Sequence, residues 1–328
     1  MDNDNHTFIK NSEAINPEWL VDGLIPTGDK ALIIAQPGVG KSFFTDALAT
    51  CITYDKPFIG LDTVGGEVLI VDQDTSEDKT RERLSKFENH YDGERPHTLY
   101  LYSQEGYAMD DGSLATLINS YPDLTLVILD TLARVVGKAD IDKTRDISNL
   151  LATFYESINN KNLTIITNHH ITTKRDTSPI DFMTYSNPQS LAMNSTQIVA
   201  SCDTLYIMAS PDADGELKTL MVRPKDRRTT IPVKPFTTEL IDADNELYFT
   251  DYQLIDIFQH LSQSAERALD VFPIGEATTF KDIVNRSDRY FGENNLREKI
   301  IPELENKGYI KYMGRTGKGG AINWTRIQ

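Results

Sequence analysis

The chain has 328 residues, of which 39% are hydrophobic and 25% are charged, and its formal net charge is −16. These values suit a globular protein, and the acidic balance argues against a basic surface that binds nucleic acid over the whole molecule. No apolar run approaches the roughly 18 residues of a membrane span, and the distant cysteines Cys51 and Cys202 predict neither a zinc site nor a disulfide framework. Together with the polar, acidic N-terminus, this predicts a cytoplasmic protein that does not contact a membrane.

A glycine-rich stretch over residues 35–42 follows the apolar run 31–34 and precedes a helix-like segment. Strand, glycine-rich turn and helix form the context of a phosphate-binding P-loop, whose N–H groups and helix dipole attract an anion. Ala35 stands where this motif has its first glycine, and alanine is small enough to keep the turn. The alternative is a glycine turn before an ordinary helix. We expect ATP to contact eight consecutive residues: Gln36, Pro37, Gly38, Val39, Gly40, Lys41, Ser42 and Phe43.

Apolar runs alternate with helix-like segments along the chain, which predicts a doubly wound α/β core. The runs are rich in Val, Ile and Leu with little alternation, as in parallel strands that are buried on both faces. The predicted strands span residues 31–35, 67–71, 98–102, 125–129, 163–167 and 204–208, and the predicted helices span 43–53, 78–88, 112–119, 146–159 and 190–200. Residues 216–249, which follow a hairpin turn at 212–215, are expected to extend the sheet with antiparallel strands.

Acidic side chains end two of the predicted strands. Asp130 follows the apolar run 124–129 and, together with the Ser42 hydroxyl, is expected to hold Mg²⁺, whereas Lys41 is expected to reach the β- and γ-phosphates of ATP. Many carboxylates at strand ends only cap a turn, and this reading remains the alternative. Carboxylates at residues 72–78 offer a general base that orients the attacking water, or else they cap the next helix.

Two adjacent histidines, His169 and His170, end the strand predicted at 163–167. Adjacent side chains on a strand point to opposite faces, which argues against a shared metal site. We favour contact of His170 with the γ-phosphate, so that it reports hydrolysis to the following loop, over a structural hydrogen bond. The long loop after this strand contains Lys174 and Arg175 and is a candidate for binding single-stranded DNA.

Residues 222–228 form a basic segment that contains Lys225 and Arg227. Cations this far from the P-loop in sequence suit an arginine finger that reaches the ATP of a neighbouring subunit, and a solvated basic turn is the alternative. The segment therefore links the predicted ATP chemistry to a homo-oligomer.

A domain boundary is expected near residue 250, which gives an ATPase domain over 1–250 and a second domain over 251–328. Helices are predicted at 252–272, 280–285 and 293–307, followed by strands at 309–313 and 321–324 around a glycine-rich turn. This order predicts a winged helix-turn-helix, which usually meets duplex DNA and otherwise docks proteins. The candidate DNA contacts are Arg297 and Lys299 on the recognition helix and Arg315 and Lys318 on the wing.

In their order along the chain, these segments resemble the RecA-fold ATPases, and among them the RepA-type hexameric helicases of plasmids and phages. The resemblance covers roughly residues 17–240 and includes the lead-in 17–28, the segment 65–74, the Walker B segment 130–134 and the segments 169–174 and 192–200. It implies a RecA-like fold with a parallel sheet. It also implies that Asp74, one methylene shorter than the glutamate of the family, is the catalytic carboxylate, and that Lys225 and Arg227 form the Lys-x-Arg pair inserted into the adjacent active site.

The resemblance further implies an ATP- and Mg²⁺-dependent replicative helicase, a homo-oligomeric ring and commonly a hexamer, that moves along single-stranded DNA. The principal alternative is an ATP-switched DNA-binding adaptor, helicase loader or regulator with little unwinding activity, because the acidic body and the short Asp74 side chain both favour slow turnover. A recombination mediator that coats single strands is a weaker alternative. A small-molecule kinase is disfavoured because the basic loop and the winged tail have no role in one.

Overall fold

The structure is a computed structural model, and it describes residues 18–139, 144–171, 196–209, 218–226, 235–254, 263–272, 277–287, 290–306, 309–315 and 322–326. Its centre is a sheet that contains six parallel strands in the order β8-β3-β7-β6-β4-β5. These strands are β3 (Lys30–Ala35), β4 (Glu67–Asp72), β5 (Leu99–Ser103), β6 (Leu124–Asp130), β7 (Thr164–His170) and β8 (Thr204–Ala209). All six predicted core strands are therefore present, with ends that differ from the prediction by at most three residues.

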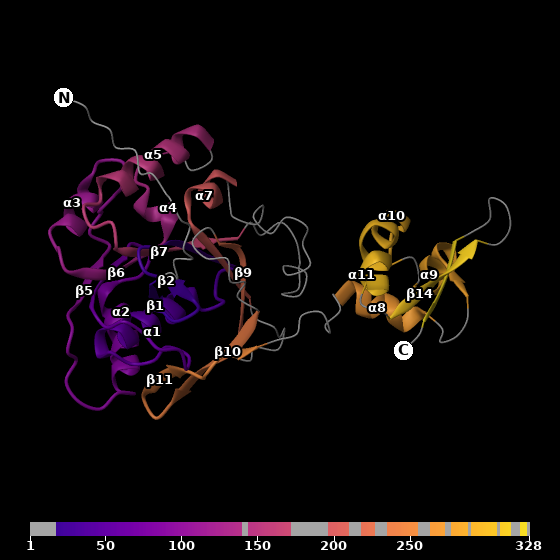
Figure 1. Cartoon of the computed structure of the whole chain (residues 1–328), viewed down its shortest axis with the longest axis horizontal. Coiled ribbons are helices and arrows are strands. Elements are labelled where there is room, and N and C mark those ends of the chain that lie inside the picture. Colours follow the sequence, from indigo (N-terminus) through magenta and orange to yellow (C-terminus); the bar gives the residue numbers. More distant parts are fainter. Residues whose placement is uncertain are drawn as a thin grey trace, which may run out of the picture.

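Helices cover both faces of this sheet, as the apolar, non-alternating strands require (Figure 1). Along β3, Ala31 and Ile33 belong to the apolar cluster on one face, and Leu32 and Ile34 belong to the cluster on the other. One face packs against α1 (Lys41–Tyr54) and α2 (Glu77–Glu88). The opposite face packs against α3 (Ser113–Asn119), α4 (Leu132–Val135), α5 (Thr144–Ser157) and α7 (Thr196–Ser201).

Antiparallel strands extend the sheet beyond β8, as predicted for residues 216–249 (Figure 1). They are β9 (Lys218–Asp226), β10 (Phe236–Ala243), β11 (Glu246–Phe249) and β12 (Gln253–Leu254). The last of these corrects a prediction, because the helix expected to begin at residue 252 is replaced at 253–254 by a strand that pairs with β10. The polar, exposed side chain of Gln253 and the hydrogen-bonding edge of β10 explain the strand better than helical periodicity does. A separate two-stranded sheet pairs β1 (Trp19–Val21) with β2 (Ile25–Pro26).

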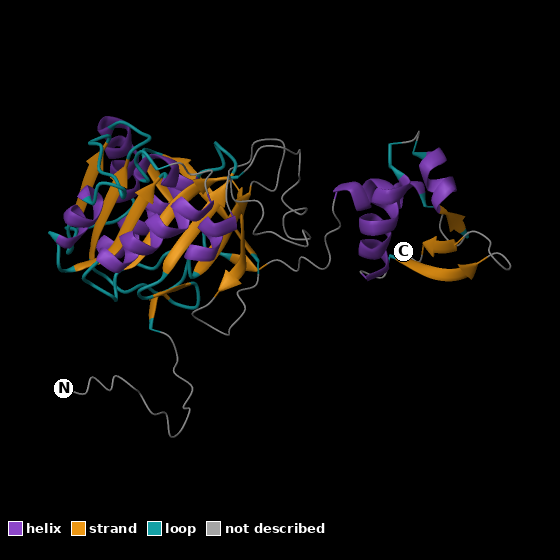
Figure 2. Ribbon diagram, turned by 90° about the horizontal axis from the view of Figure 1, so that it is seen from above, coloured by secondary structure: helices purple, strands orange, loops and turns teal. Residues whose placement is uncertain are grey.

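The C-terminal residues have their own apolar cluster, which includes Leu296, Ile300 and Trp324. Helices and a three-stranded antiparallel sheet in the order β13-β15-β14 surround it (Figure 2). The elements are α8 (Gln263–Val271), β13 (Thr278–Thr279), α9 (Phe280–Arg286), α10 (Glu293–Asn295), the π-helical turn η2 (Leu296–Ile300), α11 (Ile301–Asn306), β14 (Ile310–Arg315) and β15 (Ile322–Arg326). The predicted helices at 280–285 and 293–307 and the two predicted strands are present. In the described part of the chain, no helix is both long and apolar enough to cross a membrane.

Candidate functional site

The predicted P-loop is the turn that connects β3 to α1. Gly38 and Gly40 have φ angles of +82° and +98°, in the left-handed region that only glycine enters without strain. A Cβ atom at either position would meet nothing within 4 Å, so backbone conformation, not crowding, requires glycine here. Gly40 caps α1, and the first N–H groups of that helix have no intrahelical partner and point out of its N-terminus. The turn therefore offers N–H donors and a helix dipole to an anion.

Lys41 is buried at the start of α1 and its ammonium points back across the turn. Its Nζ donates to the carbonyl oxygens of Ala35 at 3.2 Å and Gln36 at 3.4 Å and lies 3.4 Å from Nδ1 of His170. Burial lowers the pKa of Lys41, while the negative charges of Asp130 and Asp74 oppose that shift. The predicted phosphate-binding lysine and the predicted sensor histidine are thus in contact, although 129 residues separate them.

Ser42 and Asp130, the two predicted Mg²⁺ ligands, contact each other directly. Ser42 Oγ donates to Asp130 Oδ2 at 2.5 Å, and Asp130 ends β6 almost fully buried. Burial raises the pKa of Asp130, and hydrogen bonds from Ser42 and Asn168 oppose this shift. A hydroxyl and a carboxylate are the hard oxygen donors that Mg²⁺ prefers, so the residues fit the ion. Because no three His, Cys, Asp or Glu side chains of the described residues are arranged to hold a metal, Mg²⁺ here would also need phosphate and water oxygens.

Asp72, the last residue of β4, and Asp74, two residues later, have different surroundings. Asp72 is 1% exposed, and its Oδ1 accepts the backbone N–H groups of Asp74 at 3.0 Å and Thr75 at 2.8 Å, while Oδ2 accepts the Thr80 hydroxyl at 3.0 Å. Asp74 has a side chain that is 44% exposed, with Oδ1 lying 3.4 Å from Nε of Arg134. Asp72 therefore fixes the turn, which leaves Asp74 as the carboxylate that can meet a water molecule.

The strand register brings these ends together. Asp72 is the Cα partner of Asp130, and Ala35 is the Cα partner of His170. Because β3, β7, β6 and β4 are adjacent and parallel, their carboxyl ends form one edge of the sheet, where ligands of open α/β sheets bind. His169 is buried on the opposite face from His170, as the alternation of a strand predicts. Burial and the nearby Lys41 lower the pKa of His170, and Asp74 opposes this shift.

Sequence reasoning missed a buried ionic network behind the site. Arg83 of α2 donates from Nε to Asp46 of α1, and its Nη2 lies 3.8 Å from Oδ2 of Asp72. Burial raises the pKa of Asp46 to about 7, although the Arg83 charge opposes the shift. One signal was available, since Arg83 lies beside Leu84 and Phe87 on the buried face of α2, where an arginine needs a partner.

Several predicted contacts are not brought to this site by the described residues. Arg297 and Lys299 have exposed side chains on the helical segment 293–306, and the Arg297 guanidinium lies 5.3 Å from the Phe280 ring centroid. The backbones of Lys225 and Arg315 lie in β9 and β14, but their side chains are outside the described part of the structure. Lys174, Arg175, Arg227 and Lys318 lie outside the described residues, as does the hairpin turn predicted at 212–215.

Comparison with known proteins gives one family. The family described as an AAA domain matches residues 7–176, which is just over half of the chain. Among solved structures, a KaiC-like protein from the hyperthermophilic archaeon Pyrococcus horikoshii is 14% identical, with a match that covers 70% of this chain and 93% of that chain at a TM-score of 0.46. No curated protein matches the sequence.

Proposed function

The chain belongs to the AAA domain family, and from that premise we propose that it is a ring-forming DNA motor of the RepA type. In this proposal the protein is a replicative helicase of a plasmid, phage or other mobile element. It hydrolyses ATP at the interfaces between subunits and uses the energy to move along single-stranded DNA. The core over 1–250 is a RecA-like ATPase domain, and residues 251–328 form a winged-helix domain.

One observation supports the ATPase chemistry more than any other. Three adjacent strand ends, those of β3, β7 and β6, bring the Ser42–Asp130 pair, with 2.5 Å between oxygens, next to the Lys41–His170 contact at 3.4 Å. These residues come from sequence positions that span 129 residues, and their charge types suit a triphosphate with its metal. A purely structural network does not require a buried lysine in contact with a histidine next to a turn whose glycines have positive φ angles.

Each group then has a chemical task. Residues 36–43, through the backbone N–H groups of all of them except Pro37, and the Lys41 ammonium bind the phosphates. Lys41 also meets the charge that develops on the transferring phosphoryl group. Ser42 and Asp130 hold Mg²⁺, which when bound supplies positive charge to the phosphate oxygens. Asp74 orients the attacking water and accepts its proton, since its carboxylate is the exposed one of the pair after β4. The imidazole ring of His170 contacts the terminal phosphate, and the same ring contacts Lys41 through Nδ1.

Coupling to DNA uses segments that follow these groups in sequence. His170 ends β7, so a change at its ring is passed to the loop with Lys174 and Arg175, the proposed contacts of single-stranded DNA. Lys225 and Arg227, from the end of β9 onwards, are proposed to enter the ATP site of the neighbouring subunit. This arrangement requires a homo-oligomer, and a hexameric ring is the form we propose.

The C-terminal element order supports the winged helix. A helix, a short strand, two helical segments and a two-stranded hairpin follow one another, and the three strands form one sheet. Arg297 and Lys299 are exposed on the second helical segment, where a recognition helix meets the major groove. Arg315 and Lys318, at and between the hairpin strands, would contact the DNA backbone. We propose that this domain binds duplex DNA.

Strand separation tests this function. The full chain is incubated with ATP, Mg²⁺ and a forked duplex that carries a fluorophore and a quencher, with Lys41→Ala as the matched control. We expect unwinding by the wild type and none by the variant. Unwinding that persists in Lys41→Ala, or its absence in a wild-type protein that hydrolyses ATP, contradicts the helicase proposal.

The ion pair between Arg134 and Asp74 favours a second function. A base that is one methylene shorter than the glutamate of the resembled family, and that faces an arginine at 3.4 Å, suits slow turnover. The protein would then be an ATP-switched DNA-binding adaptor, loader or regulator. ATP-dependent binding to duplex DNA without strand separation would favour this function over the motor.

A further inference from the structure

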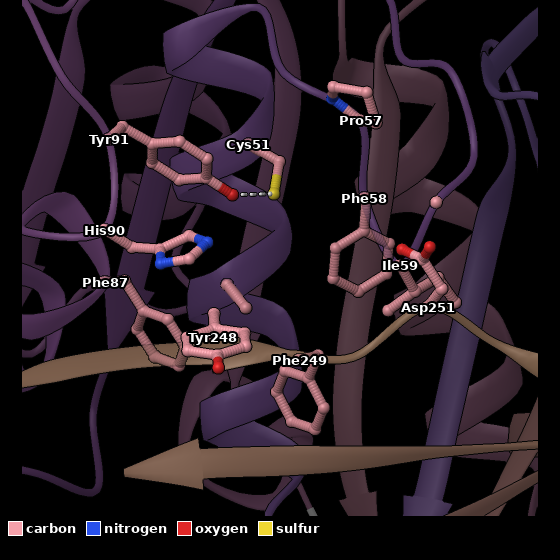
Figure 3. A pocket seen from close by; sticks show the side chains of 12 residues that line it. Cys51, Pro57, Phe58, Ile59, Phe87, His90, Tyr91, Tyr248, Phe249 and Asp251 are labelled. Atoms are coloured by element: carbon pink, nitrogen blue, oxygen red, sulfur yellow. Dashed lines mark hydrogen bonds between the residues drawn. The ribbon is translucent and has the colours of Figure 1, made fainter. Parts of the chain in front are cut away.

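A cavity lies away from the P-loop, beside the middle and C-terminal half of α1. Its volume is about 360 Å³, which is within the range of small-molecule sites. Ala47 and Cys51 of α1 line it, together with the loop after that helix, the end of α2, β11 and Asp251 (Figure 3). Figure 3 shows Phe87, His90, Tyr91 and Tyr248 on one side of the cavity and Phe58, Ile59 and Asp251 on the other.

Rings dominate the lining. Six of the twelve lining residues have aromatic side chains: Phe58, Phe87, His90, Tyr91, Tyr248 and Phe249. Phe58 and Phe87, on opposite sides of the cavity, are almost fully buried, and His90 and Tyr248 stack at 4.2 Å with 15° between their planes. Aromatic rings stack and make edge contacts best with other flat rings, so the lining selects a planar molecule.

Polar contacts hold two of the lining segments together. His90 Nδ1 lies 3.1 Å from Oε2 of Glu246, and Asn89 Nδ2 donates to the carbonyl oxygen of Asn245 at 3.0 Å. These contacts join the end of α2 to the β10–β11 hairpin, two segments 156 residues apart in sequence. The cavity is therefore formed in advance, which lowers the cost of ordering it around a ligand.

The charges of the lining restrict the ligand further. Asp251 contributes a carboxylate, and none of the twelve lining residues is a lysine or an arginine. Asp251 lies close to Gly60, since a Cβ atom added to Gly60 would lie 2.8 Å from Cγ of Asp251. Cys51 Sγ lies 3.1 Å from the Tyr91 hydroxyl oxygen, and burial raises the pKa of Cys51 to about 12, so the thiol stays neutral. An anion, including a nucleoside triphosphate, finds no lysine or arginine in this lining, whereas a cation finds the Asp251 carboxylate.

We propose that this cavity is a second ligand site, distinct from the P-loop, for a planar aromatic molecule that carries a protonated amine. The ring lies between the aromatic side chains on the two sides of the cavity. The amine donates to Asp251 at the edge of the cavity. The ligand touches α1 at Ala47 and Cys51, and α1 also carries Lys41 and Ser42 at its other end.

Two probes with one ring and opposite charges test the proposal on the full chain. Tryptamine and indole-3-propionate are titrated separately and followed by ligand-observed NMR. We expect saturable binding of tryptamine with a Kd in the sub-millimolar range, as suits a ligand of this size. Indole-3-propionate should bind at least roughly tenfold more weakly, because it places a carboxylate against Asp251. An absence of saturation by tryptamine up to about 10 mM, or equal affinity for the two probes, overturns the proposal.

Variants locate the binding. Asp251→Asn should reduce the preference for tryptamine to less than about threefold, whereas Asp123→Asn, the same charge change at an exposed acid before β6, should leave it unchanged. Ala47→Met places a larger side chain into the cavity and should abolish tryptamine binding while ATP binding persists. If Ala47→Met does not fold, as judged by its thermal melt, Asp251→Asn decides alone. A preference unaffected by Asp251→Asn, or tryptamine binding by a folded Ala47→Met, contradicts the assignment.

Discussion

The two ends of helix α1 lie in different chemical surroundings. At its N-terminus, Lys41 and Ser42 lie among carboxylates and a histidine, and hydrogen bonds of defined length hold the groups in place. Five to ten residues later, Ala47 and Cys51 line a cavity whose shape comes from packed rings. Ligand binding at the first end depends on individual charged atoms, whereas ligand binding at the second depends on the volume of the cavity. One helix can therefore serve two sites that respond to different substitutions, and the predictions below separate them.

The largest expected effect is that of Lys41→Ala, which removes the cation from the charged end. ATP turnover should fall by roughly 100-fold or more, because no other described side chain places a positive charge on the glycine turn. Tryptamine binding at the other end should remain. Steady-state phosphate release and the NMR titration measure the two effects. Turnover retained by the variant would mean that the P-loop does not take part in ATP hydrolysis.

Asp74→Asn separates ATP binding from hydrolysis within the charged end. The amide cannot accept a proton, so turnover should drop on the order of 100-fold, while the affinity for a fluorescent ATP analogue stays within about twofold because Asp74 is not a predicted phosphate ligand. Asp78→Asn, at an exposed acid in the first turn of α2, is the matched control. Equal turnover by Asp74→Asn and the wild type would show that another group acts as the base.

Asp46 lies between the two ends of α1 and should make stability depend on pH. Burial raises the pKa of Asp46 to about 7 in the folded chain, above its ordinary value of 3.8. Between these values the folded state binds a proton that the unfolded state has released, so this contribution to stability falls as pH rises from about 4 to about 7 and is flat above. The difference in unfolding free energy between wild type and Asp46→Asn, measured in urea at pH 4.5, 6 and 7.5, should show that slope. A difference that is constant with pH contradicts it.

Arg134→Gln should have the smallest effect. The ion pair with Asp74 is exposed, with side-chain exposures of 65% and 44%, and such a pair contributes about 1 kcal/mol or less. Turnover should change by no more than about fivefold, and Arg134→Lys should change it less. In an Asp74→Asn background, Arg134→Gln should have no further effect on turnover, because its partner is already neutral. Additive losses would mean that Arg134 acts through some other group.

Periodicity and motif order predicted the core of the fold well. Strands such as β3 and β6 are continuous apolar runs, and the polar residues at their ends follow from where parallel strands meet. The contact between His170 and Lys41 is explained in the same way, because β7 and β3 are neighbours and end at the same edge of the sheet. Local pattern failed at β12, where pairing with the edge of β10 decides the conformation. It also left the roles of Asp72 and Asp74 open until their exposure was known.

Neither the Arg83–Asp46 contact nor the aromatic cavity was predicted from the sequence. Arg83 and Asp46 are 37 residues apart on two helices, and only the packing of α1 against α2 brings them together. The cavity lies between segments that are distant in sequence, since the residues that hydrogen-bond the end of α2 to the β10–β11 hairpin are 156 positions apart. Such sites depend on how elements pack, which the periodicity of one segment does not contain.

The central claim is that the groups around Lys41 hydrolyse ATP to drive movement on single-stranded DNA. Its most direct test is steady-state ATP hydrolysis by the purified full chain with Mg²⁺, alone, with single-stranded DNA and with duplex DNA. We predict turnover that single-stranded DNA stimulates strongly and duplex DNA stimulates less. ATP binding without appreciable turnover on any of these DNAs would contradict the motor and favour the ATP-switched adaptor.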